Sequence, residues 1–470
     1  MIELNAQRIS LLYALTGFFF IASILALLYG GKDLPIISVI IFLSSLLLCL
    51  IILSNRMALL SPMFMFCFLQ LTLFSLSWLP FITTDFLWND TYYNADSHSV
   101  LNAIIKLNLL TSFWIIIATL THISFKFKSK WRSIDTDTNF KIIGIFIVIL
   151  SLISFSILIS KAGSIFEILI QRELSREDRI STEIGRHWFA LAQIGTLGLA
   201  LWAFSDKFTF KTWYFYPIFF LSILVGFIVS GNRTSIVMSS ILIYAAWSFH
   251  SKKIISPSII LMILLLISTL GFATLIREEG ITSLQNDGYD NRVSQIDTLK
   301  KIWEIRAERS VSGSANLGIL ISLENGAPYI LGESYKSIPY IPIPSAILSY
   351  PKPPAGGKLA AFKLSGRTDT AWPISPVIEA YWNFGIFGVI FSALLYGMLS
   401  SIIFSIMKNN YKSTILIVGY FSYITLFSVG SDGFYKFLQA GIPLFILYVL
   451  LKILFLIKSF VLNSRNYRDA

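Results

Sequence analysis

The sequence is poor in charged residues, which make up 13% of its 470 positions, compared with about 25% in soluble domains. Hydrophobic residues account for 55%, and the mean hydropathy is +0.72. A chain with so little solvating charge cannot cover a soluble surface of this size. The composition therefore excludes a soluble enzyme and predicts a single integral membrane domain over residues 1–470.

Cysteine and histidine are also scarce, with two and four copies. Cys49 and Cys67 fall inside apolar runs, where neither a disulfide framework nor a thiolate metal site is expected. The sequence has no phosphate-binding glycine loop followed by Lys-Ser or Lys-Thr, no His-Glu-x-x-His and no serine nucleophile elbow. We therefore expect neither a metal nor a cofactor.

Long apolar runs are what the chain has in abundance. A membrane-crossing helix needs roughly 20 apolar residues, and about twelve runs approach that length. They lie near 9–29, 34–54, 58–81, 100–125, 141–161, 188–205, 213–230, 234–250, 258–276, 376–406, 414–430 and 438–457. The sequence thus predicts an all-α polytopic membrane protein with about 12 transmembrane helices.

The net charge of +11 reflects membrane orientation rather than a nucleic-acid partner, because most Lys and Arg residues lie at the ends of apolar runs. Short cytoplasmic loops are enriched in these residues. Alternate connections are basic, at Arg8, Arg56, Lys126–Arg132, Lys207–Lys211, Lys252–Lys253, Lys408–Lys412 and Lys458–Arg468. With an even number of spans, this alternation places both termini in the cytoplasm.

Two long connections on the outer side, 162–187 and 277–375, break the charge pattern. In the first, Arg172, Arg176 and Arg179 follow i, i+4, i+7 spacing and share a helix face. Guanidinium groups suit phosphate oxygens, so this arginine-rich loop predicts a site for a lipid-linked pyrophosphate without metal. The alternative is a surface helix neutralised by nearby acids, namely Glu173, Glu177, Asp178 and Glu183.

The large loop 277–375 is expected to be ordered and partly helical. Residues Asn291–Ser310 have an amphipathic helical pattern, and an apolar stretch from Ala315 to Leu323 ends at the turn signal Asn325-Gly326. Proline spacing from Ile338 to Pro354 excludes helix there and predicts extended chain close to the bilayer.

A carboxylate and an amide enter the membrane directly after this loop. Glu379 and Asn383 are four residues apart and share a face in the outer half of the span near 376–406. Polar groups at that depth are expensive and usually serve a site. The alternative is a structural hydrogen bond between helices.

Three other polar residues near the membrane have two possible interpretations each. Arg233 sits in a tight outer turn between two spans and either faces a cavity or snorkels. His187, next to Arg186 in the arginine-rich loop, is either a base or an interfacial polar residue. Lys106, a turn or two into its helix, either faces the same cavity or snorkels outward, and snorkelling is the favoured interpretation.

Three stretches resemble the Wzy-type O-antigen and oligosaccharide repeat-unit polymerases of bacterial surface polysaccharide pathways. They are Ser230-Gly-Asn-Arg-Thr-Ser235, Gly332-Glu-Ser-Tyr-Lys336 with the Ile-Pro and Tyr-Pro-Lys-Pro run behind it, and Ser375-Pro-Val-Ile-Glu-Ala-Tyr-Trp-Asn-Phe-Gly385. The expected topology, about twelve spans with two large outer loops, is similar as well. The resemblance covers most of the chain.

The resemblance implies a multi-pass enzyme of the bacterial inner membrane whose site faces the periplasm. Such an enzyme passes a growing glycan on undecaprenyl pyrophosphate to one new lipid-linked repeat unit. The arginines implied in pyrophosphate binding are Arg172, Arg176, Arg179, Arg233, Arg277 and Arg367. Glu379 is the first candidate base and His187 the second, while Asn383, Tyr340 and Lys336 are implied in positioning the acceptor or sugar.

The resemblance also implies a co-polymerase partner that regulates chain length, beside the lipid-linked oligosaccharide and membrane lipid. Two other functions stay open, an O-antigen ligase-like transferase and a flippase for the same lipid-linked sugar. Transporters usually bind at the midplane through broken helices and seldom need an ordered outer loop of about 100 residues. The loop therefore favours an enzyme.

Overall fold

The computed structural model describes the chain in segments, and every helix and turn below belongs to them. These segments are residues 34–53, 60–68, 70, 97–125, 127, 140–164, 168, 186–205, 209–230, 233–251, 315–343, 348, 351–368, 371–372, 374–411, 413–429 and 433–466. All the secondary-structure elements within them are helices. The prediction of an α-helical membrane protein is confirmed at this level.

Nine of the twelve expected apolar runs coincide with helices in the described residues. Four of these helices are long and apolar enough to cross a membrane, by length and composition: Ser99–Ser124, Phe140–Ala162, His187–Ser205 and Pro376–Asn409. The runs near 9–29 and 258–276 lie outside the described residues, and the run near 58–81 is described only at 60–68 and 70. The total of twelve spans and the cytoplasmic termini stay predictions.

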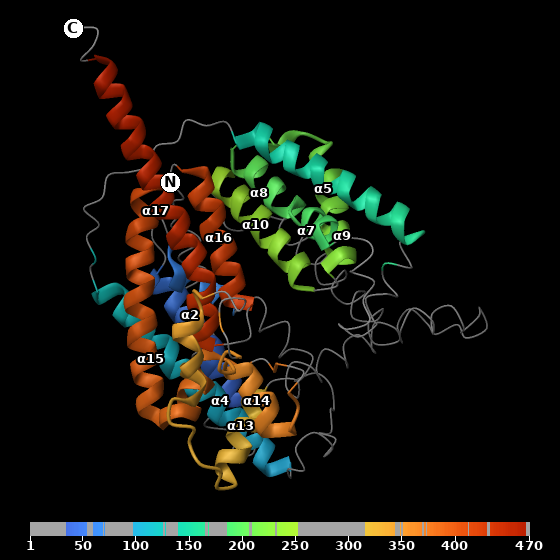
Figure 1. Ribbon diagram of the computed structural model, residues 1–470. Coiled ribbons are helices and arrows are strands. Elements are labelled where there is room, and N and C mark those ends of the chain that lie inside the picture. Colours follow the sequence, from blue (N-terminus) through green and yellow to red (C-terminus); the bar gives the residue numbers. More distant parts are fainter. Residues whose placement is uncertain are drawn as a thin grey trace. The chain divides into compact units, whose positions relative to one another are not determined.

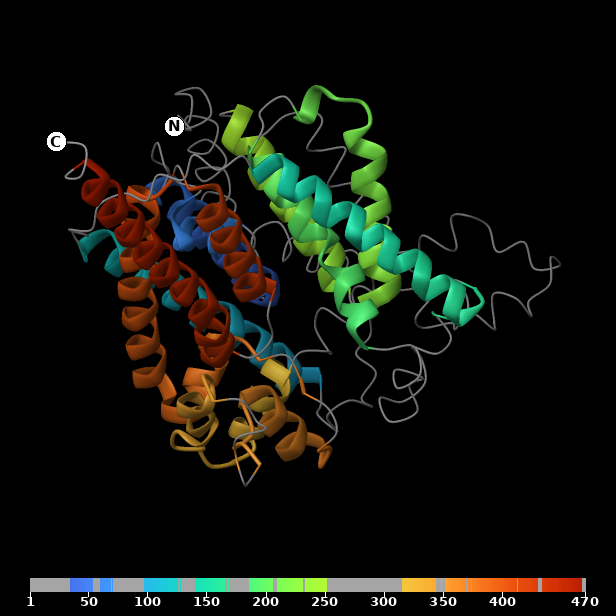
Figure 2. The same ribbon diagram turned by 45° about the horizontal axis from the view of Figure 1, so that its top comes forward.

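The described helices fall into two compact units. The first contains α5 (Phe140–Ala162), α7 (Arg186–Gln193), α8 (Gly195–Ser205), η3 (Thr209–Lys211), α9 (Phe215–Ser230), α10 (Arg233–Ser251) and most of α16 (Thr414–Val429). Figure 2 shows α5 in teal lying along the green helices α7 to α10. The candidate span His187–Ser205 consists of two consecutive helices, α7 and α8, joined by a turn at Ile194.

Small residues bring α5 and α8 into backbone contact. A Cβ on Gly144 would lie 2.6 Å from the carbonyl oxygen of Gly198, and a Cβ on Gly198 would lie 2.7 Å from that of Gly144. Further along α5, the hydroxyl of Ser151 donates to the carbonyl of Ala192 at 2.7 Å. Such close approach through small residues is how apolar helices associate where lipid provides no hydrophobic driving force.

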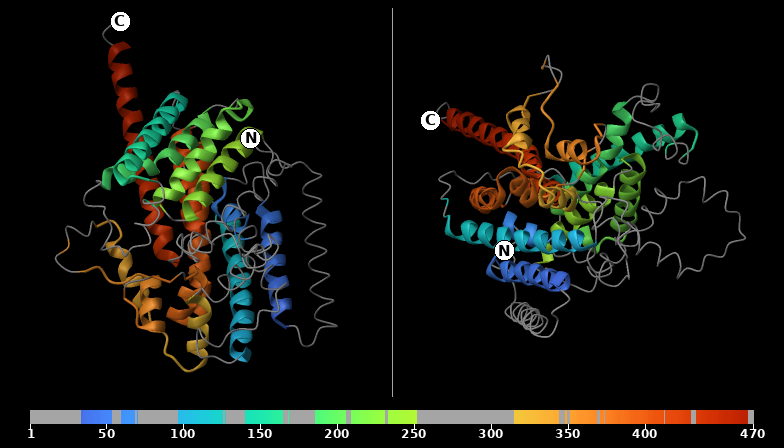
Figure 3. Two further views of the ribbon diagram at one scale, coloured as in Figure 1. Left: turned by 90° about the vertical axis from the view of Figure 1, so that its right-hand side faces the viewer. Right: turned by 90° about the horizontal axis from the view of Figure 1, so that it is seen from below.

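In its described residues, the second unit includes four long helices and three short ones. The long helices are α2 (Leu34–Leu53), α4 (Ser97–Ser124), α15 (Pro376–Asn409) and α17 (Gly433–Asn466). The short ones are α13 (Ala315–Glu324), η4 (Glu333–Tyr340) and α14 (Gly356–Ser365). Figure 3 shows α2 in blue beside α4 in cyan, and α15 packs against α4.

The α4–α15 contact combines close packing with buried polar bonds. Trp114 of α4 donates from its indole nitrogen to the hydroxyl of Ser392 at 2.9 Å, and its ring meets Tyr396 edge-on at 4.9 Å between centroids. A Cβ on Gly397 would lie 2.5 Å from the carbonyl oxygen of Ala118. These contacts fix the register of the two helices.

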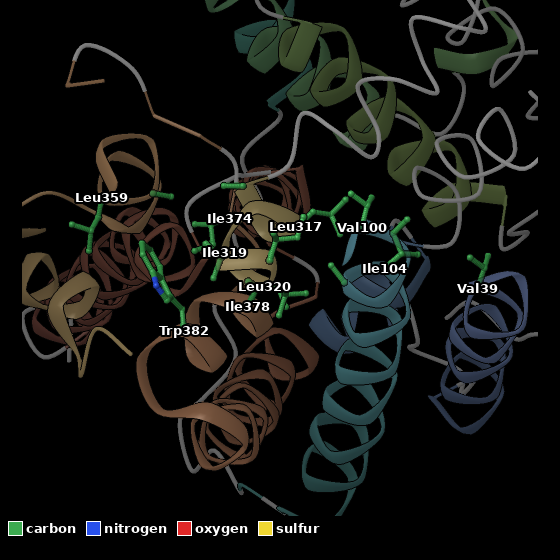
Figure 4. Packing of buried hydrophobic residues seen from close by; sticks show 14 residues of the cluster. Val39, Val100, Ile104, Leu317, Ile319, Leu320, Leu359, Ile374, Ile378 and Trp382 are labelled. Carbon is green, nitrogen blue, oxygen red and sulfur yellow. The ribbon is translucent and has the colours of Figure 1, made fainter. Parts of the chain in front are cut away.

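We call the described residues of 315–372, which include the three short helices, the lid. The lid packs onto the end of this unit where the long helices begin (Figure 1). A buried cluster joins Val39 near the start of α2 and Val100 in the first turn of α4 to Leu320, Leu359 and Trp382 (Figure 4). The expected apolar helix from Ala315 is confirmed and ends before Gly326, whose φ is +88°. The lid is therefore an ordered structure with its own core.

The expectation of extended chain from Ile338 is wrong for its first residues. Pro339 lies inside η4. Its missing backbone N–H does not end this short 3-10 helix. The N–H of Ile341 bonds to the carbonyl of Ile338 at 3.1 Å, on either side of the proline. The amphipathic helix expected at Asn291–Ser310 lies outside the described residues.

Candidate functional site

A break divides α15 and defines the candidate site. Phe384 and Gly385 have non-helical angles, with φ +61° and ψ −146° at the glycine. This combination is essentially restricted to glycine. Gly388 cannot carry a side chain either, because its Cβ would collide with the carbonyl of Ala380 and approach Cβ of Phe384 to 3.1 Å. The expected continuous span near 376–406 is thus a short helix, Pro376–Asn383, followed by a long one.

Glu379 is fully buried in this short helix. Its Oε2 accepts a hydrogen bond from the backbone N–H of Phe434 at 2.9 Å. Phe434 is the second residue of α17, where a helix has N–H groups without intrahelical acceptors and favours negative charge. The carboxylate therefore joins the start of α15 to the start of α17.

A glycine of the lid makes room for this carboxylate. Gly356, the first residue of α14, is buried, and a Cβ there would lie 2.5 Å from Oε1 of Glu379. Ile374 closes the same side, 3.5 Å from that Cβ position. Glycine at position 356 is thus required by packing against the carboxylate of Glu379.

Asn383 fastens the lid to the short helix. Its Oδ1 accepts from the N–H of Gly332 at 2.8 Å, while its Nδ2 donates to Oγ of Ser334 at 2.9 Å and to the carbonyl of Glu379 at 2.7 Å. Asn383 and Ser334 are both fully buried. Glu379 and Asn383 are therefore brought together, and each bonds to a different neighbouring segment.

Tyr335 of η4 borders the carboxylate. Its ring lies 6.4 Å from that of Phe434 and 6.3 Å from that of Phe384, between centroids. Burial and the negative charge of Glu379 together raise the pKa of the Tyr335 phenol above its ordinary value. The phenol is therefore neutral at physiological pH and available as a hydrogen-bond donor.

The other predicted lid residues lie on its surface. Lys336 is exposed on η4, and Tyr340 is the half-buried last residue of that helix. Arg367 is exposed directly after Gly366, which ends α14 in a left-handed conformation. Lys363 forms an ion pair of 2.9 Å with Glu333, linking α14 to η4.

Lys106 does not point away from the protein. Its Nζ lies 3.5 Å from a carboxylate oxygen of Glu324 and 5.1 Å from the ring centre of Tyr381. The expected outward snorkelling is thus replaced by an ion pair with the end of α13 and a cation–π contact. Tyr329 packs edge-on to the same Tyr381 ring at 6.1 Å.

The remaining predicted residues belong to the first unit or lie outside the described residues. His187 is exposed as the second residue of α7, with its ring 5.0 Å from that of Trp188. Arg233 is the first residue of α10, three positions after α9 ends at Ser230, and the turn expected between them lies outside the described residues. The arginines outside the described residues are Arg172, Arg176, Arg179 and Arg277.

Several residues of this site escaped the sequence analysis. Ser334 and Tyr335 belong to the Gly332–Lys336 stretch, but its pattern does not say which side chains turn inward. The sequence analysis gave Gly356 no role, because its packing against Glu379 depends on the three-dimensional structure. The backbone N–H of Phe434 could not be identified, because a backbone group has no residue-specific signal in a sequence. In the described part of the chain, no three His, Cys, Asp or Glu residues come together as a metal site.

Comparisons of this chain with protein-family models, with curated proteins and with solved structures gave no match.

Proposed function

We propose that the chain polymerises undecaprenyl-pyrophosphate-linked oligosaccharide repeat units into O-antigen or a related surface polysaccharide, at the periplasmic face of the bacterial inner membrane. The observation that carries the proposal is the fully buried Glu379, enclosed by an ordered lid at the end of a bundle of apolar helices. A buried ionisable group at a membrane edge is expensive and commonly functional.

The reaction needs a base and an anion-binding group. The acceptor hydroxyl oxygen forms a bond to the anomeric carbon of the donor glycan, and the bond from that carbon to the pyrophosphate oxygen breaks. Glu379 takes the hydroxyl proton, and undecaprenyl pyrophosphate leaves with the electron pair. The arginines Arg172, Arg176, Arg179, Arg233, Arg277 and Arg367 offset its charge, without a metal.

The base role requires movement of the lid. Glu379 has no exposed surface, and Gly356 of α14 covers its Oε1. A sugar hydroxyl can reach the carboxylate only when α14 or η4 moves away. Tyr335, Tyr340 and Lys336 are on η4, so the same movement presents them to the glycan.

The test is a gel ladder of surface polysaccharide from cells whose own copy is deleted and replaced by wild type, Glu379→Gln, Arg176→Ala or the exposed-lysine control Lys358→Ala. Membrane abundance is checked by blot. We expect one repeat unit after deletion, a full ladder with wild type and Lys358→Ala, and a lost ladder with the other two.

Other outcomes point elsewhere. Long polymer that is not attached to its acceptor after deletion assigns the chain as a ligase, and repeat units retained on the cytoplasmic side assign it as a flippase. A full ladder from Glu379→Gln at normal abundance removes the carboxylate from the chemistry and leaves it a structural role.

A further inference from the structure

A strained turn in the lid carries a leucine at its tip. The N–H of Glu333 donates to the carbonyl of Ile330 at 3.0 Å, which closes a four-residue turn. Its two central residues both have positive φ, +46° at Leu331 and +87° at Gly332. Turns of this kind favour Asn, Asp or Gly at both positions. Leu331 is the one non-glycine residue with positive φ in the described chain.

The turn is held in place from both sides. The N–H of Ile330 donates to the carbonyl of Trp382 at 3.1 Å, and the N–H of Gly332 donates to Oδ1 of Asn383 at 2.8 Å. A Cβ on Gly332 would lie 3.3 Å from the ring of Phe384. The turn therefore sits against the break in α15, with Leu331 directed outward and 76% exposed.

The exposed leucine continues an apolar surface of α15. Phe384 at the break and Phe387 one turn later are 47% and 79% exposed. Further along the same helix, the exposed large apolar residues are Phe391, Leu394 and Met398. From Phe387 onward, these positions recur every three or four residues, so they form one stripe on the helix after the break.

The length of α15 indicates how deep in the membrane this apolar surface lies. The stretch from Ile386 to Met407 has no charged residue and is about 33 Å long at 1.5 Å per residue. The hydrocarbon core of a bilayer is about 30 Å thick. The part of α15 after the break is thus sufficient to cross the membrane, and Phe387 lies in its first turn, at the boundary.

We propose that the Ile330–Glu333 turn anchors the lid in the bilayer, with Leu331, Phe384 and Phe387 inserted among the acyl chains of the adjacent leaflet. The occupant of this surface is membrane lipid, because the surface is continuous with the lipid-facing stripe of the helix that crosses it. The anchor sets the height of the lid and keeps Asn383 at headgroup level. This inference does not depend on the proposed catalytic activity.

The test uses a single fluorescent label on the full chain in lipid nanodiscs. Native Cys49 and Cys67 are buried and are replaced by alanine, after which Leu331→Cys, Lys336→Cys or Phe391→Cys carries an NBD group. Nanodiscs contain phosphatidylethanolamine and phosphatidylglycerol with a spin label at acyl carbon 5 or 12. Lys336 is exposed on the same lid and is the matched control; Phe391 marks the spanning helix.

We expect blue-shifted emission at position 331 and at least twofold stronger quenching by the carbon-5 lipid than at position 336. Position 391 should be quenched more by the carbon-12 lipid than position 331 is. The proposal is overturned if the emission at position 331 has the same long wavelength and the same weak lipid quenching as the emission at position 336. Blue-shifted emission without lipid quenching also overturns it, since the leucine is then covered by protein, such as a second copy of the chain.

Discussion

The backbone N–H of Phe434 donates a hydrogen bond of 2.9 Å to the carboxylate of Glu379, across 55 positions of sequence. Through this bond, the short helix before the break in α15 and the first turn of α17 share one charged group. The carboxylate accordingly has two roles to separate, as the acceptor that satisfies a helix N–H and as the candidate base. The first two predictions below separate them.

Replacing Glu379 by Gln keeps an acceptor oxygen for the Phe434 N–H and removes the charge, whereas Ala removes both. We expect Glu379→Ala to lower the free energy of unfolding by about 1–3 kcal/mol and Glu379→Gln to lower it by less. Both should abolish the polysaccharide ladder. Thermal unfolding in nanodiscs and the ladder assay check this pair. Equal unfolding temperatures for Gln and Ala contradict the capping role.

Adding one methyl group at Gly356 should displace the carboxylate without changing its chemistry. The new Cβ would lie 2.5 Å from Oε1 of Glu379, so we expect Gly356→Ala to cost about 1–3 kcal/mol and to remove most of the ladder. Lys358→Ala, on the exposed side of the same helix, is the control and should behave as wild type. A Gly356→Ala chain with a normal ladder shows that the close contact is unimportant.

Asn383 should contribute more to lid stability than Ser334 does. Asn383→Ala removes three hydrogen bonds and leaves the N–H of Gly332 without its Oδ1 acceptor, whereas Ser334→Ala removes one of the three. We expect losses of about 2–4 kcal/mol and about 1 kcal/mol. Hydrogen–deuterium exchange of residues 329–343 should rise strongly in Asn383→Ala and slightly in Ser334→Ala. Similar exchange in both variants would place the attachment of the lid elsewhere.

Tyr335 should make stability sensitive to alkaline pH. Because its folded pKa is raised by burial and by Glu379, the folded state holds the phenol proton above pH 10 while the unfolded state releases it. Stability is full below about pH 10 and falls above it, by up to about 1.4 kcal/mol at pH 11 from this residue. Tyr335→Phe removes this dependence. Unfolding of both chains at pH 8 and pH 11 measures it, and parallel losses for the two contradict the assignment.

Gly385 should tolerate substitution less well than a glycine in an ordinary left-handed position. Gly385→Ala forces an alanine into φ +61° and ψ −146°, at about 3 kcal/mol. Gly366→Ala, at φ +73° and ψ +1° with open space around it, should cost about 1 kcal/mol. Unfolding temperatures of the two variants decide this order. The reverse order means that the break is not fixed by its glycine.

Regular helices were predictable because hydrophobic runs of membrane length leave a strong signal. The starts of α2, α4 and α5 lie within three residues of the expected runs, and Asn325-Gly326 correctly ended α13. The break at Phe384 was not predicted, since Phe-Gly inside an apolar run has the same hydropathy as continuous helix. Only packing of Gly388 against Ala380 and the turn at Leu331 reveals why the helix stops there.

The site was predictable only in part. Glu379 and Asn383 stood out because polar groups in an apolar run are costly, and both are buried side by side. Their partners could not be inferred, since the Phe434 N–H has no side-chain signature. The ion pair of Lys106 could not be inferred either, because it depends on the position of Glu324 in three dimensions. The grouping of the arginines around this carboxylate stays a prediction.

The Glu379–Phe434 bond also constrains the order of biosynthesis. The ribosome makes Glu379, the lid and the whole of α15 before the first turn of α17 exists, so this bond cannot form on the growing chain. Formation of α17 completes the enclosure of the carboxylate. A chain truncated before residue 433 should therefore form its earlier helices and still leave the candidate site unassembled, so the site matures only after α17 has been made.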